Sequence, residues 1–253
     1  ARQRKKMVVQ AGAGTGKTTT LTQVAEELAA QGRKGTLVVF GRANAADARR
    51  KLAHVPVQVA TMHALAHQAV ARPFSQRLKN QTTPDWETTA RRMGLSTLVL
   101  PSKTVLEAPG LARLINRAVE TFELSADTRI GVQHINRPPG MDSQDFSLLQ
   151  RALEPHLSRA WEDMCDPHGS LFKFRHDTYV KIWHLSGPRI SVGDYLMVDE
   201  AQDMTPVFRA ILQLQTHMQQ MWVGDPNQSI YAYRGAINAL EGQNPDVTLT
   251  LTQ

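Results

Sequence analysis

Short apolar runs alternate with stretches of helical periodicity in the first part of this chain. Residues 7–10 form one apolar run, and Leu21, Val24, Ala25 and Leu28 then recur at helical spacing until Gly32 supplies a stop. Residues 37–40 predict a second strand, residues 43–52 a helix, and the segment around 57–59 a third strand. This alternation favours an α/β fold with a parallel sheet.

The middle of the chain has a different pattern, with helical segments broken by proline and loops at residues 80–85 and 136–140. We interpret residues 72–189 as an inserted helical subdomain. Pro155 is predicted to kink or split its clearest helix. Core packing is enough to explain the apolar residues that recur along that helix at spacings of three and four, namely Phe146, Leu149, Leu153, Leu157, Trp161 and Met164.

The α/β pattern returns near the end of the sequence. Residues 195–198 predict a strand, Thr205 followed by Pro206 marks a helix start, and residues 221–223 predict another strand. In residues 247–251 apolar residues alternate with threonines, which predicts a last strand with one buried face. We therefore expect one α/β domain formed by residues 1–71 and 190–253, interrupted by the helical subdomain.

Composition limits the class of protein and its partners. The chain has 253 residues, of which 42% are hydrophobic and 21% charged, as in globular proteins. Its net charge of +6 fits either an anionic partner or a solvated basic surface. A single cysteine, Cys165, excludes an internal disulfide framework, and no apolar run is long enough to span a bilayer. We expect no membrane association, and a cytoplasmic location in a bacterium or a nuclear one in a eukaryote.

A phosphate-binding loop lies between the first predicted strand and helix. Residues 11–18 read AGAGTGKT and fit the P-loop pattern except that Ala11 replaces the first glycine. Backbone amides of such a loop approach phosphates, Lys17 reaches the β and γ phosphates, and Thr18 ligates magnesium. The expected ATP-binding residues in this loop are Ala11, Gly12, Ala13, Gly14, Thr15, Gly16, Lys17, Thr18 and Thr19.

Two carboxylates follow the predicted strand at 195–198. Asp199 would hold Mg²⁺, and Glu200 would orient and deprotonate the water that attacks the γ phosphate. On its own, an acidic pair after a strand is more often a helix cap or a solvated edge. Together with the phosphate loop upstream, it indicates ATP hydrolysis, with Glu200 and Lys17 as catalytic residues.

Two further segments resemble a known family. Residues 199–203, DEAQD, and residues 223–236, VGDPNQSIYAYRGA, resemble motifs II and III of the UvrD/Rep family of superfamily 1 DNA helicases, and the run 224–240 is most similar to the F-box DNA helicase branch. Thr61-Met62-His63 is similar to motif Ib, and residues 40–52 match motif Ia loosely. The resemblance implies a RecA-like first motor domain with a helical insertion. It also implies ATP-driven translocation on single-stranded DNA, usually 3′ to 5′, and unwinding of duplexes at single-/double-strand junctions.

The resemblance also assigns roles to single residues. Gln228 would sense the γ phosphate as a catalytic and ATP-binding residue. Gln202 would also bind ATP and link the ATP site to the loop after residue 224, and Asp225 would support that loop.

DNA contacts are assigned in the same way. Tyr233 would stack on a base, which suits binding to any sequence, with Tyr231 and Arg234 beside it; core aromatics are the alternative interpretation. Thr61 and His63 would contact the DNA backbone, and Phe40 would line the path of the strand. In residues 173–183, basic and aromatic side chains suit nucleic acid and a solvated amphipathic helix about equally.

The sequence also lacks segments that the family has. We expect a fragment without the second motor domain. In the family that domain supplies arginines to the ATP site, and at comparable sites such an arginine raises the rate of phosphoryl transfer by a factor of about 10³ to 10⁵. Such a fragment would bind nucleotide and turn it over slowly. Two other function classes stay open: a nucleic-acid-binding module that uses ATP as a ligand, which Glu200 and Gln228 disfavour, and an unrelated P-loop ATPase such as a recombinase, which residues 224–236 disfavour.

Overall fold

The chain folds into two compact units. The computed structural model describes residues 5–12, 15–80, 82–191, 193–225, 228, 240 and 244–251. One unit comprises Ala1–Ala66 with Ser186–Gln253, and the other comprises His67–Leu185. The second unit therefore begins before residue 72, inside helix α3 (Met62–Val70). This early start has a local reason, since the His67 ring packs edge to face on Tyr179 of the same unit.

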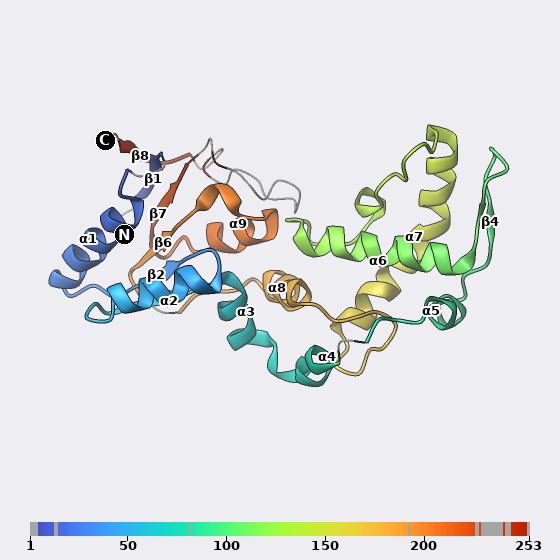
Figure 1. The fold of residues 1–253 in the computed structure, drawn as a ribbon, viewed down its shortest axis with the longest axis horizontal. Helices are drawn as coiled ribbons and strands as arrows, with labels where there is room; N and C mark the ends of the chain where they lie inside the picture. Colours follow the sequence, from blue (N-terminus) through green and yellow to red (C-terminus); the bar gives the residue numbers. More distant parts are fainter. Residues whose placement is uncertain are drawn as a thin grey trace. The chain divides into compact units, whose positions relative to one another are not determined.

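The first unit is built on a parallel sheet, as the sequence predicts (Figure 1). In the described part of the chain its six strands have the order β3-β2-β6-β7-β1-β8, and each neighbouring pair is parallel. Both faces of β6 are buried, as is typical of parallel sheets. The strands are β1 (Lys6–Ala11), β2 (Gly35–Val38), β3 (Val57–Ala60), β6 (Tyr195–Val198), β7 (Gln219–Gly224) and β8 (Val247–Leu251).

The helices of this unit pack on the sheet through short apolar faces. Side chains of α1 and α2 share one core cluster with strands β1, β2, β3, β6 and β7. Helix α1 ends as expected, because Gly32 adopts a left-handed φ of 73° and its N–H donates to the Ala29 carbonyl. Besides α3, the helices are α1 (Lys17–Ala30), α2 (Arg42–Lys51), the short 3₁₀ helix η3 (Ala201–Asp203) and α9 (Pro206–Gln213).

Two strands differ from the prediction. Strand β2 covers Gly35–Val38 instead of residues 37–40, and only glycine fits at its start because a Cβ on Gly35 would lie 2.2 Å from the Tyr195 ring. Strand β8 has no buried face: Leu249 is 46% exposed, and Val247 and Leu251 are only partly buried. The reason is its position at the sheet edge, where β1 is its one partner among the strands that the structure describes.

The second unit is mainly helical and has its own core. Helices α5, α6 and α7 supply most of the buried apolar cluster, which includes Leu149, Leu153 and Leu157. The structure also contains a small antiparallel hairpin, β4 with β5, that the sequence reading missed. The elements are η1 (Arg72–Phe74), α4 (Ser75–Lys79), α5 (Trp86–Met93), β4 (Leu98–Val99), β5 (Val105–Leu106), α6 (Ala108–Leu124), η2 (Val132–His134), α7 (Ser143–Cys165) and α8 (His176–Leu185).

Helix α7 runs through Pro155 without interruption, so the predicted split is wrong. Pro155 lies on the exposed face, where water can satisfy the carbonyl that loses its N–H partner. Leu153 and Leu157 on the opposite face are almost completely buried. Their packing holds the helix together across the proline.

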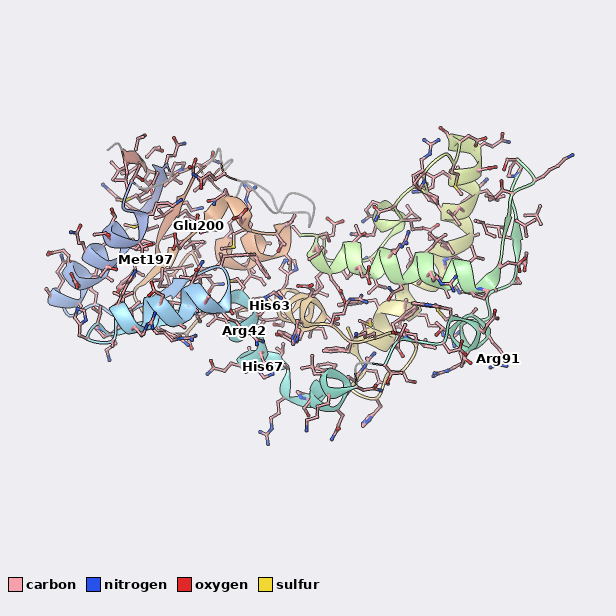
Figure 2. The ribbon with its side chains drawn as sticks, in the orientation of Figure 1. Arg42, His63, His67, Arg91, Met197 and Glu200 are labelled. Carbon is pink, nitrogen blue, oxygen red and sulfur yellow. The ribbon has the colours of Figure 1, made fainter. Side chains whose placement is uncertain are left out.

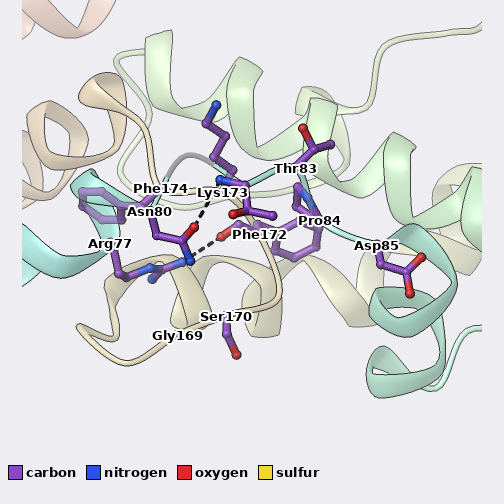
Figure 3. A pocket seen from close by; sticks show the side chains of 11 residues that line it. Arg77, Asn80, Thr83, Pro84, Asp85, Gly169, Ser170, Phe172, Lys173 and Phe174 are labelled. Atoms are coloured by element: carbon purple, nitrogen blue, oxygen red, sulfur yellow. Dashed lines mark hydrogen bonds between the residues drawn. The ribbon is translucent and has the colours of Figure 1, made fainter.

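Arg77 donates several hydrogen bonds inside the second unit and lines a pocket there (Figure 3). Its guanidinium is 7% exposed and donates to the carbonyls of Asp163, Asp166 and Phe172 and to the Asp163 carboxylate. It borders a cavity of about 250 Å³, and a Cβ on Gly169 would lie 2.6 Å from the Arg77 Nη1 atom. These contacts tie α4 to the chain around residues 163–172, so Arg77 has a structural role.

Helix α8 is neither a basic surface nor a solvated amphipathic helix. Tyr179, Lys181 and Trp183 are buried. The Lys181 ammonium donates to the carbonyls of Ser125 and Asp127, and burial lowers the pKa of Lys181 to about 8. For Lys181, Tyr179 and Trp183 both interpretations are therefore wrong, because these side chains lie inside the fold and the cation of Lys181 caps backbone carbonyls.

The second unit also buries an acidic residue, Glu123. It is 1% exposed and accepts hydrogen bonds from the Thr178 hydroxyl at 2.6 Å and from Arg175 Nε at 3.0 Å. Burial raises the pKa of Glu123 to about 7, although Arg175 opposes this shift.

Replacing Arg77 tests its structural role. We expect Arg77→Ala to lower the free energy of unfolding by about 3–5 kcal/mol, because it removes the cation paired with the Asp163 carboxylate and the hydrogen bonds that Arg77 donates to backbone carbonyls. Urea unfolding would measure this loss. Arg72→Ala, at an exposed arginine nearby, is the control and should change stability little.

The buried acid predicts a pH dependence. Because the pKa of Glu123 rises from 4.5 to about 7 on folding, the folded protein holds more protons in that window. The free energy of unfolding should then fall with rising pH by up to about 1.4 kcal/mol per pH unit. Glu123→Gln should flatten this part of the urea-unfolding profile. Glu162→Gln, on the exposed face of α7, should leave it unchanged.

Candidate nucleotide site

The phosphate loop connects β1 to α1 in the first unit. Gly16 adopts a left-handed φ of 79° just before Lys17 begins α1, a conformation that favours glycine. The Thr15 hydroxyl donates to the Gly12 carbonyl at 2.8 Å and closes the turn. Ala13 and Gly14 lie outside the described residues. Helix α1 therefore begins directly at the end of the loop, so the positive end of its dipole and its first N–H groups lie on the loop side of the helix.

The sheet register brings the loop and the acidic pair to one edge. Gln10 pairs with Gly224, and Val198 pairs with both Val38 and Trp222. Strands β1, β6 and β7 therefore end side by side, where ligands bind in open α/β sheets. Glu200 lies immediately beyond the end of β6, and Met197 lies inside that strand (Figure 2).

Glu200 is held in an unusual backbone conformation. Its φ of 50° and ψ of 47° are left-handed, which costs a non-glycine residue about 1–3 kcal/mol. Its N–H donates to Asp199 Oδ1 at 3.0 Å, and Asp199 N–H in turn donates to the Val38 carbonyl. The turn directs the carboxylate at Lys17, whose Nζ lies 3.4 Å from Glu200 Oε2. The cation and the expected base thus face the same small space.

Asp199 has a shifted pKa. Burial raises the pKa of its carboxyl to about 6, and the neighbouring Glu200 charge adds to the shift. The Glu200 N–H and Lys17 act in the opposite direction. A nearby cation would favour the charged form of Asp199, which is the form that binds metal.

A cavity of about 150 Å³ opens beside these residues. The Thr18 side chain and both carboxylates line it, so it offers the few oxygen ligands that Mg²⁺ takes from protein when phosphates supply others. Among the described residues no group of three or more His, Cys, Asp or Glu side chains could hold a metal by itself. The hydroxyl of Thr18 and the carboxylates of Asp199 and Glu200 are oxygen donors of the kind that magnesium prefers. Thr19, the last expected loop residue, is exposed in the first turn of α1.

Helix α2 contributes two residues that the sequence reading missed. Asn44 and Asp47 line the same cavity. Their spacing of three places them on one side of the helix, beside the buried Ala45 and Ala48. In the sequence, two polar residues three positions apart among alanines could have indicated that this side of the helix borders a polar site.

Gln202 connects the acidic pair to the end of β7. It is 2% exposed; its Nε2 donates to Glu200 Oε2 at 2.8 Å, and its Oε1 accepts from Asp225 N–H at 3.0 Å. Gln228 N–H donates to the Asp225 carbonyl. Gly224 permits this arrangement, since a Cβ there would lie 2.4 Å from Gln202 Oε1. Both ends of the Gln202 amide are thus engaged within the protein.

The DNA residues expected from the resemblance are only partly within the described structure. Thr61 immediately precedes α3, and its hydroxyl accepts from Ala64 N–H at 3.1 Å, as an N-cap does. The His63 ring packs edge to face on Phe208 at 5.3 Å, and Phe40 is half-buried just after β2 (His63 is labelled in Figure 2). Tyr231, Tyr233 and Arg234 lie outside the described residues. None of the helices that the structure describes is long and apolar enough to cross a membrane.

The close approach of Gly224 and Gln202 can be tested by mutation. We expect Gly224→Ala to displace the Gln202 amide, to speed hydrogen exchange at the Asp225 N–H, and to lower the free energy of unfolding by about 1–3 kcal/mol. Exchange measured by NMR or mass spectrometry checks the first effect. Gly110→Ala is a matched control, because a Cβ at that helical glycine meets no atom within 4 Å. Unchanged protection at Asp225 would contradict the assigned link.

Comparison with known proteins places the chain in a family. A family model described as an AAA domain matches residues 1–234. F-box DNA helicase 1 of Gallus gallus is 30% identical over 246 residues, which cover 92% of this chain and 23% of that protein. F-box DNA helicase protein 1 of Schizosaccharomyces pombe is 30% identical over 242 residues, covering 90% and 26% respectively.

A bacterial relative matches the same region. The putative ATP-dependent DNA helicase YjcD of Bacillus subtilis is 25% identical over 248 residues, which cover 91% of this chain and 31% of that protein. The chain thus spans less than a third of the length of each of these relatives. The resemblance read from residues 199–203 and 223–236 is confirmed: the chain belongs to the AAA domain family and, among superfamily 1 DNA helicases of the UvrD/Rep type, to the F-box DNA helicase branch.

Proposed function

We propose that this chain is a motor domain that couples Mg²⁺-ATP hydrolysis to movement along single-stranded DNA and to duplex unwinding. The observation that supports this most directly is the convergence of Lys17, Asp199 and Glu200 at the end of β6, beside the phosphate loop. The names of the relatives, two F-box DNA helicases and a putative ATP-dependent DNA helicase, agree with it.

The hydrolysis step can be assigned to the residues of the site. The loop amides and Lys17 bind the phosphates and balance their charge. Glu200 orients the attacking water and accepts its proton, a role suited to a carboxylate that its backbone turn directs toward the phosphate site. Mg²⁺, held by Thr18 and Asp199, would neutralise charge on the β and γ phosphates.

Coupling would pass through Gln202. Its amide bonds both the Glu200 carboxylate and the Asp225 N–H, so a movement of Glu200 toward the nucleotide alters the support of the chain that follows β7. Gln228 would sense the γ phosphate from that segment. In this proposal Tyr231, Tyr233 and Arg234 grip the DNA by stacking and charge.

The finer features are also proposed. The substrate is single-stranded DNA and its junctions with duplex, the direction is 3′ to 5′, and Thr61, His63 and Phe40 border the strand. A second RecA-like motor domain would supply the arginines that speed phosphoryl transfer. The protein would act in the bacterial cytoplasm or the eukaryotic nucleus, where its DNA substrate lies.

The test is ATP hydrolysis by the full-length protein with and without single-stranded DNA. We expect DNA to stimulate hydrolysis and Glu200→Gln to reduce it by about 10²- to 10⁴-fold, because the water then lacks its base. Glu27→Gln, at an exposed carboxylate of α1, controls for the charge change and should hydrolyse ATP normally. ATP and DNA binding without any stimulation would instead favour an ATP-gated binding module.

A further inference from the structure

Helix α2 places two polar side chains on the wall of the nucleotide cavity. Asn44 and Asp47 line the cavity of about 150 Å³ together with the Thr18 side chain and the carboxylates of Asp199 and Glu200. Most of the remaining wall is apolar. Polar atoms thus reach the same small space both from α2 and from the first turn of α1 and the end of β6.

The volume of the cavity limits what it can hold. A water molecule takes up about 30 Å³ in the liquid, so a cavity of about 150 Å³ has room for on the order of five of them. Pockets that enclose a whole ligand of nucleotide size are larger, roughly 300–1,000 Å³. The space therefore suits one cation with the few water molecules that it keeps, while the nucleotide lies outside it along the phosphate loop.

The charges around the cavity favour a cation there. Three carboxylates line it, those of Asp47, Asp199 and Glu200. Burial and the Glu200 charge raise the pKa of Asp199 to about 6, so the charged form of Asp199 is disfavoured when the space is not neutralised. Lys17 lies 3.4 Å from Glu200, and it also has to serve the phosphates. A divalent cation would offset the charge of the other carboxylates.

Asp47 carries a charge that is only loosely engaged by the helix itself. Its carboxylate contacts Arg50 Nη2 at 3.0 Å and Lys51 Nζ at 2.8 Å, and these hydrogen bonds, the one from Lys51 first, lower the pKa of Asp47. The Arg50 and Lys51 side chains are 80% and 51% exposed, and exposed ion pairs of this kind contribute little to stability. The ionised carboxylate can therefore accept hydrogen bonds from donors in the cavity instead.

Asn44 is oriented by the chain that enters α2. Its Nδ2 donates to the Phe40 carbonyl at 2.9 Å, so the donor end of the amide is engaged and Oδ1 is the end that can accept a hydrogen bond in the cavity. Two residues before Phe40, the Val38 carbonyl accepts from the Asp199 N–H at 2.9 Å. The same short segment after β2 therefore fixes both Asn44 and Asp199.

Magnesium needs acceptors of this kind beyond its direct ligands. The ion gives up water reluctantly, so where one or two protein groups and phosphates bind it, it usually keeps several water ligands. Each of these waters donates hydrogen bonds, and groups that hydrogen-bond to the ligands of a metal orient them and tune its affinity. A carboxylate and an amide oxygen on the wall of a cavity of this size can accept such bonds.

We propose that Asp47 and Asn44 position the magnesium ion of the nucleotide site: the Asp47 carboxylate and Asn44 Oδ1 accept hydrogen bonds from water molecules that the ion keeps. This inference rests on the proposed function and deepens it, because it extends the magnesium site from Thr18 and Asp199 to helix α2. Both residues are positioning residues, since they act through the ion and its water and leave the reacting phosphate to Lys17 and Glu200.

The test measures nucleotide binding to the full-length protein without hydrolysis. A fluorescent, non-hydrolysable ATP analogue is titrated once in saturating MgCl₂ and once in EDTA. We expect Asp47→Asn, which keeps the shape and removes the charge, to raise the Kd in MgCl₂ at least about tenfold and to change the Kd in EDTA by less than about twofold. Asn44→Leu removes a neutral acceptor at similar volume, so it should weaken binding in MgCl₂ by a smaller factor and also leave the Kd in EDTA unchanged.

A matched control separates the cavity from the helix surface. Arg50→Gln with Lys51→Gln removes both cations that pair with Asp47 and leaves its carboxylate in place. This variant loses the same ion pairs as Asp47→Asn, so urea should unfold the two nucleotide-free variants at similar concentrations. The control should nevertheless bind the analogue in MgCl₂ at least as tightly as wild type, because the carboxylate is free to face the magnesium-bound water.

Three outcomes would overturn the role of α2 at the metal. A wild-type Kd for Asp47→Asn in MgCl₂ is one, and an equal loss of affinity in MgCl₂ and in EDTA is another, because the effect would then not depend on the metal. Weakened binding in MgCl₂ by the Arg50 and Lys51 variant would assign the effect to the ion pairs of the helix. If wild-type protein binds the analogue with Mg²⁺ but lacks DNA-stimulated hydrolysis, the proposed function fails, whereas the comparison of MgCl₂ with EDTA still tests Asp47 and Asn44.

Discussion

The hydrogen-bonded parallel register of β1, β6 and β7 is the constraint on which the rest of the site depends. Val198 is paired with Trp222, and Gln10 with Gly224, so the three strands end at one edge. Because the side chains that follow these strands emerge together, Lys17 and Glu200, which are 183 positions apart in the chain, come within 3.4 Å of each other. A slip of the register would separate the cation from the carboxylates, whatever their identities.

The geometry of that edge depends on two backbone features. Glu200 takes a left-handed backbone conformation, which is unfavourable for a residue with a side chain. Contacts with the surrounding structure must offset the free energy that this conformation costs. Gly224 leaves room for the Gln202 amide, which then bonds Glu200 on one side and Asp225 on the other. Together they make the acidic pair and the chain after β7 one connected structure.

The helical unit shows why polar residues are hard to place from sequence. Lys181 and Glu123 are charged, and charged residues usually lie on the surface. Both are nevertheless buried, and each forms a hydrogen bond to a residue more than fifty positions away. The hairpin of residues 98–106 shows the reverse, since Val99 and Val105 look like core residues and are exposed. In both cases the deciding factor is the neighbour that the tertiary fold supplies.

The sequence by itself determined the α/β alternation, the phosphate loop and the acidic pair after the fourth strand of the first unit, because local periodicity and short motifs encode strand, turn and helix directly. It also identified the family through residues 199–203 and 223–236, and the fold class is as predicted. Only the tertiary structure decided the strand order, the exposed face of β8, the uninterrupted α7 and the link through Gln202. Those features depend on contacts between distant segments, which no local pattern specifies.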